Sequence, residues 1–282
     1  DWSLVRPDGV FRLLAVGGST TFGPNNPEEA TWPSLLQEAL RQQGRPAEVI
    51  NCGRPSRTIE DILVNLPNWL QMQPDAVIYY EAANNAIPFP PDMPGRTVDL
   101  ILRRFHRHTW LGRLLAGLHY RSVLYTLLAE KVQFARAARG RASIVPDIPF
   151  FRTKLVRLIQ ELRTHDVTPI LVLQVTEASP EPSFQELELN DRQAVLAAVL
   201  KAVDDHLGAV DASGRDSRLA TYQTQVLVEV VRRTGLQQGV QVIDPRPAFA
   251  HAGRDAGLFC DSLHLRDAGN QSPLVSDLQD KP

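Results

Sequence analysis

The chain has 282 residues, 43% of them hydrophobic, and a net charge of −2 at pH 7, which describes an ordinary globular protein of one large domain or two small ones. The sequence has no block of like charges and no basic excess, which argues against a nucleic-acid partner. No apolar run reaches the roughly 18 residues of a membrane-spanning helix, so we expect no integral membrane segment in this chain.

Five apolar runs of strand length alternate with helical patterns along the chain. The runs lie at 11–16, 47–51, 75–80, 169–175 and 240–244, and they are continuous, which is typical of strands buried on both faces. Apolar residues at helical spacing predict helices at 32–44, 58–73 and 150–165, with Thr58 as an N-cap of the second. Alternating strands and helices predict a parallel sheet with helices on both faces.

Two segments are longer than a crossover between strands requires. Residues 88–150 open with the proline-rich PFPPDMPG and continue as one or two amphipathic helices. Residues 177–235 contain helical patterns at 191–207 and 220–235 on either side of the loop DASGRDS. Both follow a strand and emerge where open α/β folds bind ligands. We expect one domain over 1–282, in which these insertions either form a lid or substrate wall or simply pack as core.

Polar residues that can carry chemistry follow four of the strands. Ser19 follows the first, Gly53 the second and Asn84 the third, while Asp261 and His264 come after the fifth. A serine hydroxyl becomes a nucleophile when a base accepts its proton, and a histidine with a pKa of about 6.5 suits that task. A carboxylate then orients the imidazole, and Asp261 lies three residues before His264. The pattern predicts acyl transfer with these three as catalytic residues.

A tetrahedral intermediate also requires hydrogen-bond donors aimed at its oxyanion. The amides of Ser19 and Gly53 and the side-chain amide of Asn84 are expected to converge there from three adjacent loops. Asn85 competes with Asn84, and the spacing from Glu81 favours Asn84, which leaves Asn85 to stabilise its own loop or contact substrate.

Neighbouring residues are candidate substrate contacts. Gly18 and Thr20 flank Ser19, and Arg54 follows Gly53. Arg54 and Arg57 either face an anionic substrate or are solvated or paired with acidic neighbours. Each site residue also has a structural alternative: Ser19 as turn chemistry, His264 as an ordinary buried or surface histidine, and Asp261 as a helix cap.

The four blocks GGST, NCGRPS, EAANN and DSLH, in this order over residues 13–270, resemble the SGNH hydrolases, also called the GDSL esterase/lipase family, in a bacterial branch with GGST. The resemblance implies a three-layer α/β/α sandwich, flavodoxin-like, with five parallel strands in the order 2-1-3-4-5. It implies hydrolysis of a carboxylic ester, acetyl or longer, through an acyl-enzyme on Ser19, without metal or organic cofactor. The sequence departs from the family pattern at Gly18 and Asn85, where aspartate is usual, and at Ala82, where glycine is usual.

Two other functions remain open from the sequence. An O-acyltransferase or O-acetyltransferase acting on a glycan would use the same residues with a sugar hydroxyl in place of water, and a binding module would keep the fold without catalysis. The expected partner is a small-molecule, glycan or lipid ester. GGSTT lacks the second glycine of G-x-S-x-G, and the chain has neither a P-loop nor a G-x-G-x-x-G motif.

Cys52 and Cys260 immediately precede Gly53 and Asp261. They are either small residues at strand ends or a disulfide joining the two loops, which would favour an oxidising compartment. The chain begins at Asp1 without a methionine or signal peptide, and we favour an extracytoplasmic or membrane-tethered location slightly over a cytoplasmic one.

Overall fold

The computed structural model describes residues 3–86, 145–178, 182–205, 212–252, 258–259 and 264–266. The chain divides into two compact units, Asp1–Ile87 with Ile144–Pro282, and Pro88–Ser143. All described residues belong to the first unit. Most of the predicted insertion at 88–150 therefore lies outside the described residues, and the single-domain prediction stays a prediction.

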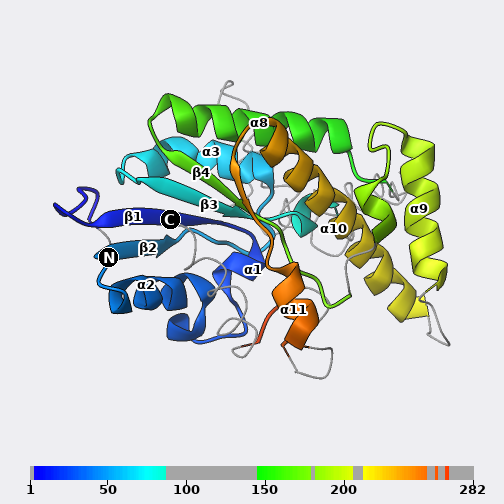
Figure 1. The fold of residues 1–282 in the computed structure, drawn as a ribbon, viewed down its shortest axis with the longest axis horizontal. Coiled ribbons are helices and arrows are strands. Elements are labelled where there is room, and N and C mark those ends of the chain that lie inside the picture. The colour runs from blue at the N-terminus through cyan, green and yellow to red at the C-terminus, as the bar shows by residue number, and fades with distance from the viewer. Residues whose placement is uncertain are drawn as a thin grey trace, which may run out of the picture. The chain divides into compact units, whose positions relative to one another are not determined.

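Five parallel strands form one sheet in the order β2-β1-β3-β4-β5 (Figure 1). Their bounds are Phe11–Gly17 (β1), Ala47–Asn51 (β2), Ala76–Tyr80 (β3), Thr168–Val172 (β4) and Gln241–Ile243 (β5). In the register of the sheet, Leu14 of β1 is paired with Ile50 of β2 and with Val77 of β3. The predicted fold class is confirmed.

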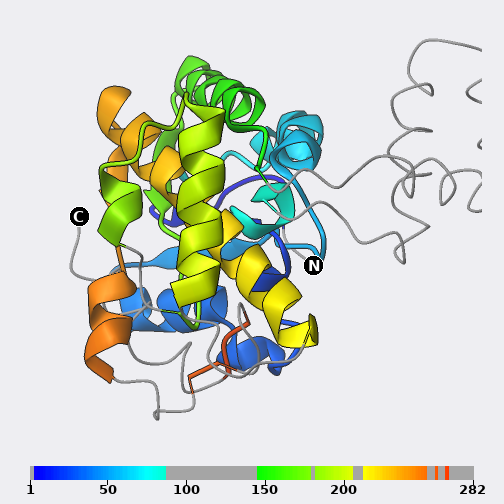
Figure 2. The same ribbon diagram turned by 90° about the vertical axis from the view of Figure 1, so that its right-hand side faces the viewer.

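Helices cover both faces of this sheet. The longer helices are Trp32–Gln42 (α2), Ile59–Leu70 (α3), Ile148–Thr164 (α8), Arg192–Asp205 (α9), Ala212–Gln237 (α10) and Arg246–Ala252 (α11), and the short ones are Ser19–Phe22 (α1), Ala83–Ala86 (α4), Glu28–Ala30 (η1) and Pro182–Gln185 (η2). α3 and α8 lie on one side of the sheet and α2 and α11 on the other (Figures 1 and 2).

The two layers of core follow from the alternation of side chains along β1. Leu14 and Val16 join a core cluster with side chains of α3, α8, α9 and α10, whereas Leu13 and Ala15 join a second cluster with side chains of α2 and α11. Because successive side chains of a strand point to opposite faces, a run that is apolar throughout contributes to both clusters.

The start of α3 is fixed by a capping box. Thr58 accepts a hydrogen bond from the backbone N–H of Asp61, and the Asp61 side chain accepts one from the backbone N–H of Thr58. These bonds satisfy N–H groups that the first turn of a helix leaves without partners. The predicted N-cap at Thr58 is confirmed.

The loop predicted at DASGRDS is wrong, because α10 already begins at Ala212 and includes all but the first of these residues. Gly214 favoured a loop, since glycine in a helix interior costs about 1 kcal/mol relative to alanine. Extending an existing helix requires no new nucleation, so one glycine does not stop it. From Thr221 to Val231 the helix is buried on every side, and it packs against α4, α8 and α9. Within the described ranges, no helix is both long and apolar enough to cross a membrane.

Candidate active site

Ser19 and His264 are in contact although 245 residues separate them in the sequence. The Oγ atom of Ser19 lies 2.7 Å from Nε2 of His264. Ser19 is the first residue of α1, directly after the carboxyl end of β1, and both side chains are half-buried. A hydroxyl at this distance from an imidazole nitrogen is the geometry of a serine nucleophile and its base.

Two glycines allow the turn that carries Ser19 to lie against the end of β3. A Cβ atom on Gly17 would lie 2.3 Å from the carbonyl oxygen of Tyr80, and one on Gly18 would lie 2.2 Å from both Asn84 Nδ2 and Glu81 Oε2. Residue 18, where the family name has aspartate, therefore has no room for a side chain in this protein.

The segment that carries His264 is anchored on both sides. Leu265 forms an antiparallel bridge with Phe259, and the Arg266 side chain donates to the Phe259 carbonyl at 3.0 Å. From the loop after α1, Asn26 Nδ2 donates to the Leu265 carbonyl at 3.1 Å. Asn26 was not predicted as a site residue, because its hydrogen-bond partner lies 239 residues later in the sequence. Asn26 thus connects the serine-bearing loop to the histidine segment directly.

Asp261, the predicted orienting acid, lies outside the described residues, as does Cys260. The role of Asp261 therefore stays a prediction. The described histidine nitrogen that faces Ser19 is Nε2, which leaves Nδ1 as the atom that an orienting carboxylate would contact.

Gly53 lies close to the backbone of α1. A Cβ atom on Gly53 would lie 2.4 Å from the backbone nitrogen of Phe22. The N–H of Gly53 donates to Asn51 Oδ1 at 2.9 Å, and the side-chain amide of Asn51 donates to the Thr21 carbonyl at 3.0 Å. The Gly53 N–H reaches an oxyanion only when its bond to Asn51 is given up, so the oxyanion role of Gly53 stays a prediction.

Asn84, in α4 after β3, lies against the Ser19 turn through Gly18. Its Nδ2 atom donates to the Arg57 carbonyl and to Glu81 Oε2, each at 3.0 Å. Its backbone N–H donates to Glu81 Oε1 at 2.6 Å. The structure therefore brings the predicted amide donor to the nucleophile loop and shows which groups hold it there.

Asn85 has a structural contact of its own. Its Oδ1 atom accepts from the backbone N–H of Ile59 at 3.2 Å, at the first residue of α3. The side chain thus satisfies an N–H group that the helix leaves without an intrahelical partner. Asn85 thus holds α3, whereas Asn84 lies at Gly18, and the choice of Asn84 over Asn85 as an oxyanion donor stays a prediction.

The remaining predicted contacts lie around the serine turn. Thr20 is buried, and its Oγ1 atom is 3.5 Å from Nε2 of Gln174. Arg54 is exposed, and its backbone N–H donates to the Gly17 carbonyl at 3.2 Å. Arg57 is half-buried and places its guanidinium over the ring of Trp69, 4.9 Å from the centroid. Of the two arginines, Arg54 is therefore the more accessible to a substrate.

The model of the GDSL-like Lipase/Acylhydrolase family matches residues 15–222, which is most of the chain. The chain belongs to this family. An arylesterase from Vibrio mimicus is 39% identical over 82 residues, a match that covers 28% of this chain and 41% of the arylesterase.

Two solved structures have the same fold as this chain. The acetyl xylan esterase AlAXEase superposes with a TM-score of 0.54 at 16% identity, over 96% of this chain and 98% of its own. A lipase/acylhydrolase from Enterococcus faecalis superposes with a TM-score of 0.54 at 18% identity, over 96% and 94% of the two chains. At these identities the likeness shows the fold.

Two buried polar residues near Ser19 were missed by sequence analysis. Glu81 is 1% exposed and Gln174 is 2% exposed. Gln174 Oε1 accepts from the backbone N–H groups of Ala82 and Ala83 at 2.7 and 3.0 Å. Both follow apolar strand residues closely, and a polar residue at the end of a buried strand was the signal available in the sequence. Gln174 thus holds the loop between β3 and α4, and Glu81 joins that loop to Asn84.

Cys52 is a free thiol beside the candidate site. Burial raises its pKa to about 12, although the nearby charge of Arg57 acts in the opposite direction. A thiol with this pKa carries almost no thiolate at neutral pH and is therefore a poor nucleophile. Among the described residues, Ser19 is the group that the structure provides with a base.

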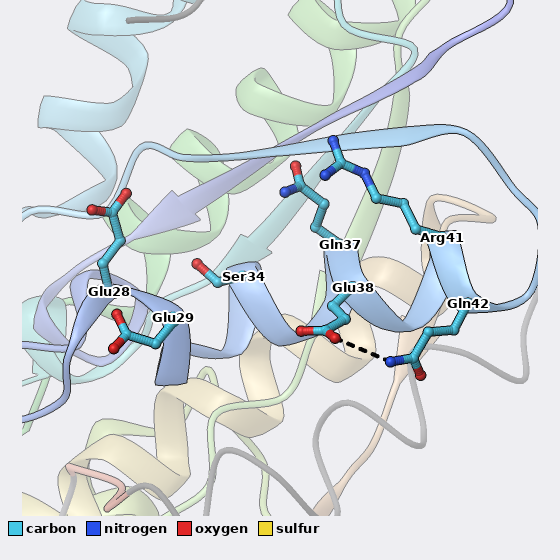
Figure 3. Close-up of a pocket in the computed structure, with 7 residues that line it drawn as sticks. All are labelled: Glu28, Glu29, Ser34, Gln37, Glu38, Arg41 and Gln42. Carbon is cyan, nitrogen blue, oxygen red and sulfur yellow. Dashed lines mark hydrogen bonds between the residues drawn. The ribbon is translucent and has the colours of Figure 1, made fainter.

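The described residues contain no group of three or more His, Cys, Asp or Glu side chains placed to hold a metal ion. An open hollow of about 670 Å³ lies over η1 and α2 (Figure 3), and none of the predicted site residues lines it. Its lining is polar and consists of Glu28, Glu29, Ser34, Gln37, Glu38, Arg41 and Gln42.

Proposed function

We propose that the protein is a serine esterase that hydrolyses a carboxylic ester through an acyl-enzyme on Ser19. The observation that carries the proposal is the 2.7 Å distance between Ser19 Oγ and His264 Nε2 at the carboxyl end of the sheet. Membership of a family of lipases and acylhydrolases supports it, and so does the partial match to an arylesterase.

In the first half of the reaction, His264 Nε2 takes the proton of Ser19 Oγ as that oxygen forms a bond to the ester carbonyl carbon. The carbonyl oxygen becomes an oxyanion, held by the Ser19 N–H and the Asn84 amide. Because the first N–H groups of a helix have no intrahelical acceptor, the start of α1 is suited to this task. The bond to the leaving alcohol then breaks, and His264 donates its proton to the departing oxygen.

In the second half, water replaces the alcohol. His264 accepts a proton from the water as its oxygen attacks the acyl carbon, and the second tetrahedral intermediate uses the same oxyanion donors. The bond between the acyl carbon and Ser19 Oγ breaks, the proton returns to Oγ, and a carboxylic acid leaves. The cycle regenerates the free enzyme and consumes one water per ester.

The test compares wild type with Ser19→Ala on p-nitrophenyl esters from acetyl to long acyl chains. We expect Ser19→Ala to abolish turnover and labelling by a fluorophosphonate probe. Ser34→Ala is the matched control, because Ser34 lies in α2, where it contacts Thr31. Turnover that persists unchanged in Ser19→Ala would refute the proposal, and the chain-length profile of the wild type identifies the acyl group.

A further inference from the structure

Glu81 is a buried carboxylate beside the nucleophile that the proposed mechanism leaves without a task. It is 1% exposed and directly follows β3. Its Oε2 atom would lie 2.2 Å from a Cβ atom on Gly18, the residue before Ser19. Burying an ionisable side chain is costly unless specific partners compensate for the lost water. Its presence at this position therefore calls for a function that a neutral or apolar residue would not serve.

The contacts of Glu81 with Asn84 suit a carboxylate. Glu81 Oε1 accepts the backbone N–H of Asn84 at 2.6 Å, and Oε2 accepts the side-chain Nδ2 of the same residue at 3.0 Å. A carboxylate has two acceptor oxygens, whereas the amide of glutamine has one acceptor and one donor group. Glutamine at residue 81 would therefore place a donor against one of the two Asn84 donors.

The second hydrogen of the Asn84 amide is held by a weaker partner. Nδ2 also donates to the Arg57 carbonyl at 3.0 Å. A hydrogen bond to an ionised carboxylate is roughly twice as strong as one to a neutral carbonyl. When an oxyanion forms, the bond to Arg57 is thus the one that is given up, while Glu81 keeps the amide in place.

We propose that Glu81 is a positioning residue. It fixes the Asn84 side chain so that one amide hydrogen turns from the Arg57 carbonyl to the oxyanion. This inference rests on the proposed function. The absence of a side chain at Gly18 is part of this arrangement, because a Cβ atom there would lie 2.2 Å from both Glu81 Oε2 and Asn84 Nδ2. Gly18, Glu81 and Asn84 therefore depend on one another.

The test measures kcat and KM of Glu81→Gln on an ester whose turnover Ser19→Ala abolishes. We expect kcat to fall about tenfold to a hundredfold with KM nearly unchanged, less than the hundredfold to thousandfold loss typical of removing an oxyanion donor outright. In an Asn84→Ala background, Glu81→Gln should have almost no further effect on kcat, because residues that act through one another are not additive.

Glu229→Gln is the matched control. Glu229 is as buried as Glu81, with 2% of its side chain exposed, but it accepts from Arg232 and Arg233 on α10. Its substitution should lower thermal stability and leave kcat within about twofold. If Glu81→Gln fails to fold, Glu81→Asp is measured instead, in the wild-type and Asn84→Ala backgrounds. The shorter aspartate carboxylate cannot reach both Asn84 donors.

A spectroscopic readout separates this inference from the proposed function. The NMR signals of the Asn84 side-chain amide, assigned by their loss in Asn84→Ala, should shift in Glu81→Gln and stay in place in Glu229→Gln. Unshifted signals, additive effects in the Asn84→Ala background, or a kcat that is unchanged or raised in Glu81→Gln would overturn the role of Glu81. Full turnover in Ser19→Ala would instead overturn the esterase mechanism, with the amide shift still reporting on Glu81.

Discussion

The two ends of the sheet both contain a buried charged side chain, but the partners differ. At the amino end, Arg12 is fully buried and meets an opposite charge, with Nε 2.8 Å from Glu48 Oε2, and donates to the Met72 carbonyl at 2.5 Å. At the carboxyl end, Glu81 accepts from the amides of Asn84. The first arrangement joins segments of the fold, whereas the second holds a side chain beside Gly18, next to Ser19.

This difference predicts that changes at the amino end affect stability and changes at the carboxyl end affect activity. The largest effect is expected for His264→Ala, which removes the base 2.7 Å from Ser19 Oγ. Turnover should fall by about 10⁴-fold or more while the unfolding midpoint is kept, since in a serine hydrolase loss of the histidine base alone costs about as much as loss of the whole triad. The double variant with Ser19→Ala should be no slower than either single variant, and additive losses would show that the two do not act as a unit.

At the amino end, Arg12→Met should destabilise the fold and spare the chemistry. Removing the guanidinium leaves Glu48 without its buried partner, which costs about 3–5 kcal/mol in the free energy of unfolding. Arg6→Ala is the control, because the Arg6 side chain is 37% exposed in its pair with Asp75 and should cost less than about 1 kcal/mol. The free energy of unfolding in urea and kcat are measured on the same samples. A large loss of kcat in folded Arg12→Met would contradict the prediction that the amino end affects stability alone.

A pair of glycine substitutions tests the same contrast with the same chemical change. In Gly18→Ala the new methyl group meets Glu81 and Asn84 at 2.2 Å, so we expect kcat to fall about tenfold to a hundredfold. Gly9, before β1, has no atom within 4 Å of an added Cβ but has a φ of +71°, so Gly9→Ala should cost about 1 kcal/mol in stability and leave kcat unchanged. Equal losses of kcat in Gly18→Ala and Gly9→Ala would contradict the prediction that activity depends on the carboxyl end of the sheet.

The sequence predicted the sheet well because most of β1 and all of β3 are continuous apolar runs, and burial on both faces of a parallel sheet is what such a run requires. It also predicted that Ser19, Asn84 and His264 lie at one edge, and the structure places Ser19 against His264 and brings Asn84 to Gly18. Residues that act through tertiary contacts were missed. Gln174 has no motif, since its contacts arise only when the ends of β3 and β4 meet. Glu81 bonds within its own loop, to Asn84, but its approach to Gly18 depends on the pairing of β1 with β3. Propagation of α10 across Gly214 depends on the neighbouring residues, which the propensity of one glycine does not include.

The smallest effects on activity are expected at Cys52, which is close to the site in sequence but has no place in the proposed chemistry. Its pKa rises from 9.0 to about 12 on folding because burial disfavours the thiolate. The unfolded chain therefore loses this proton first as the pH rises, so the contribution of Cys52 to stability is complete below pH 9 and declines between pH 9 and about 12. Cys52→Ala should flatten that decline and leave kcat within about twofold.

At pH 8, alkylation of Cys52 should be at least about a hundredfold slower in the native protein than in urea, since only the thiolate reacts. Fast alkylation of the folded enzyme with loss of turnover would mean that the thiol is accessible and borders the substrate, which would move Cys52 from the scaffold to the site.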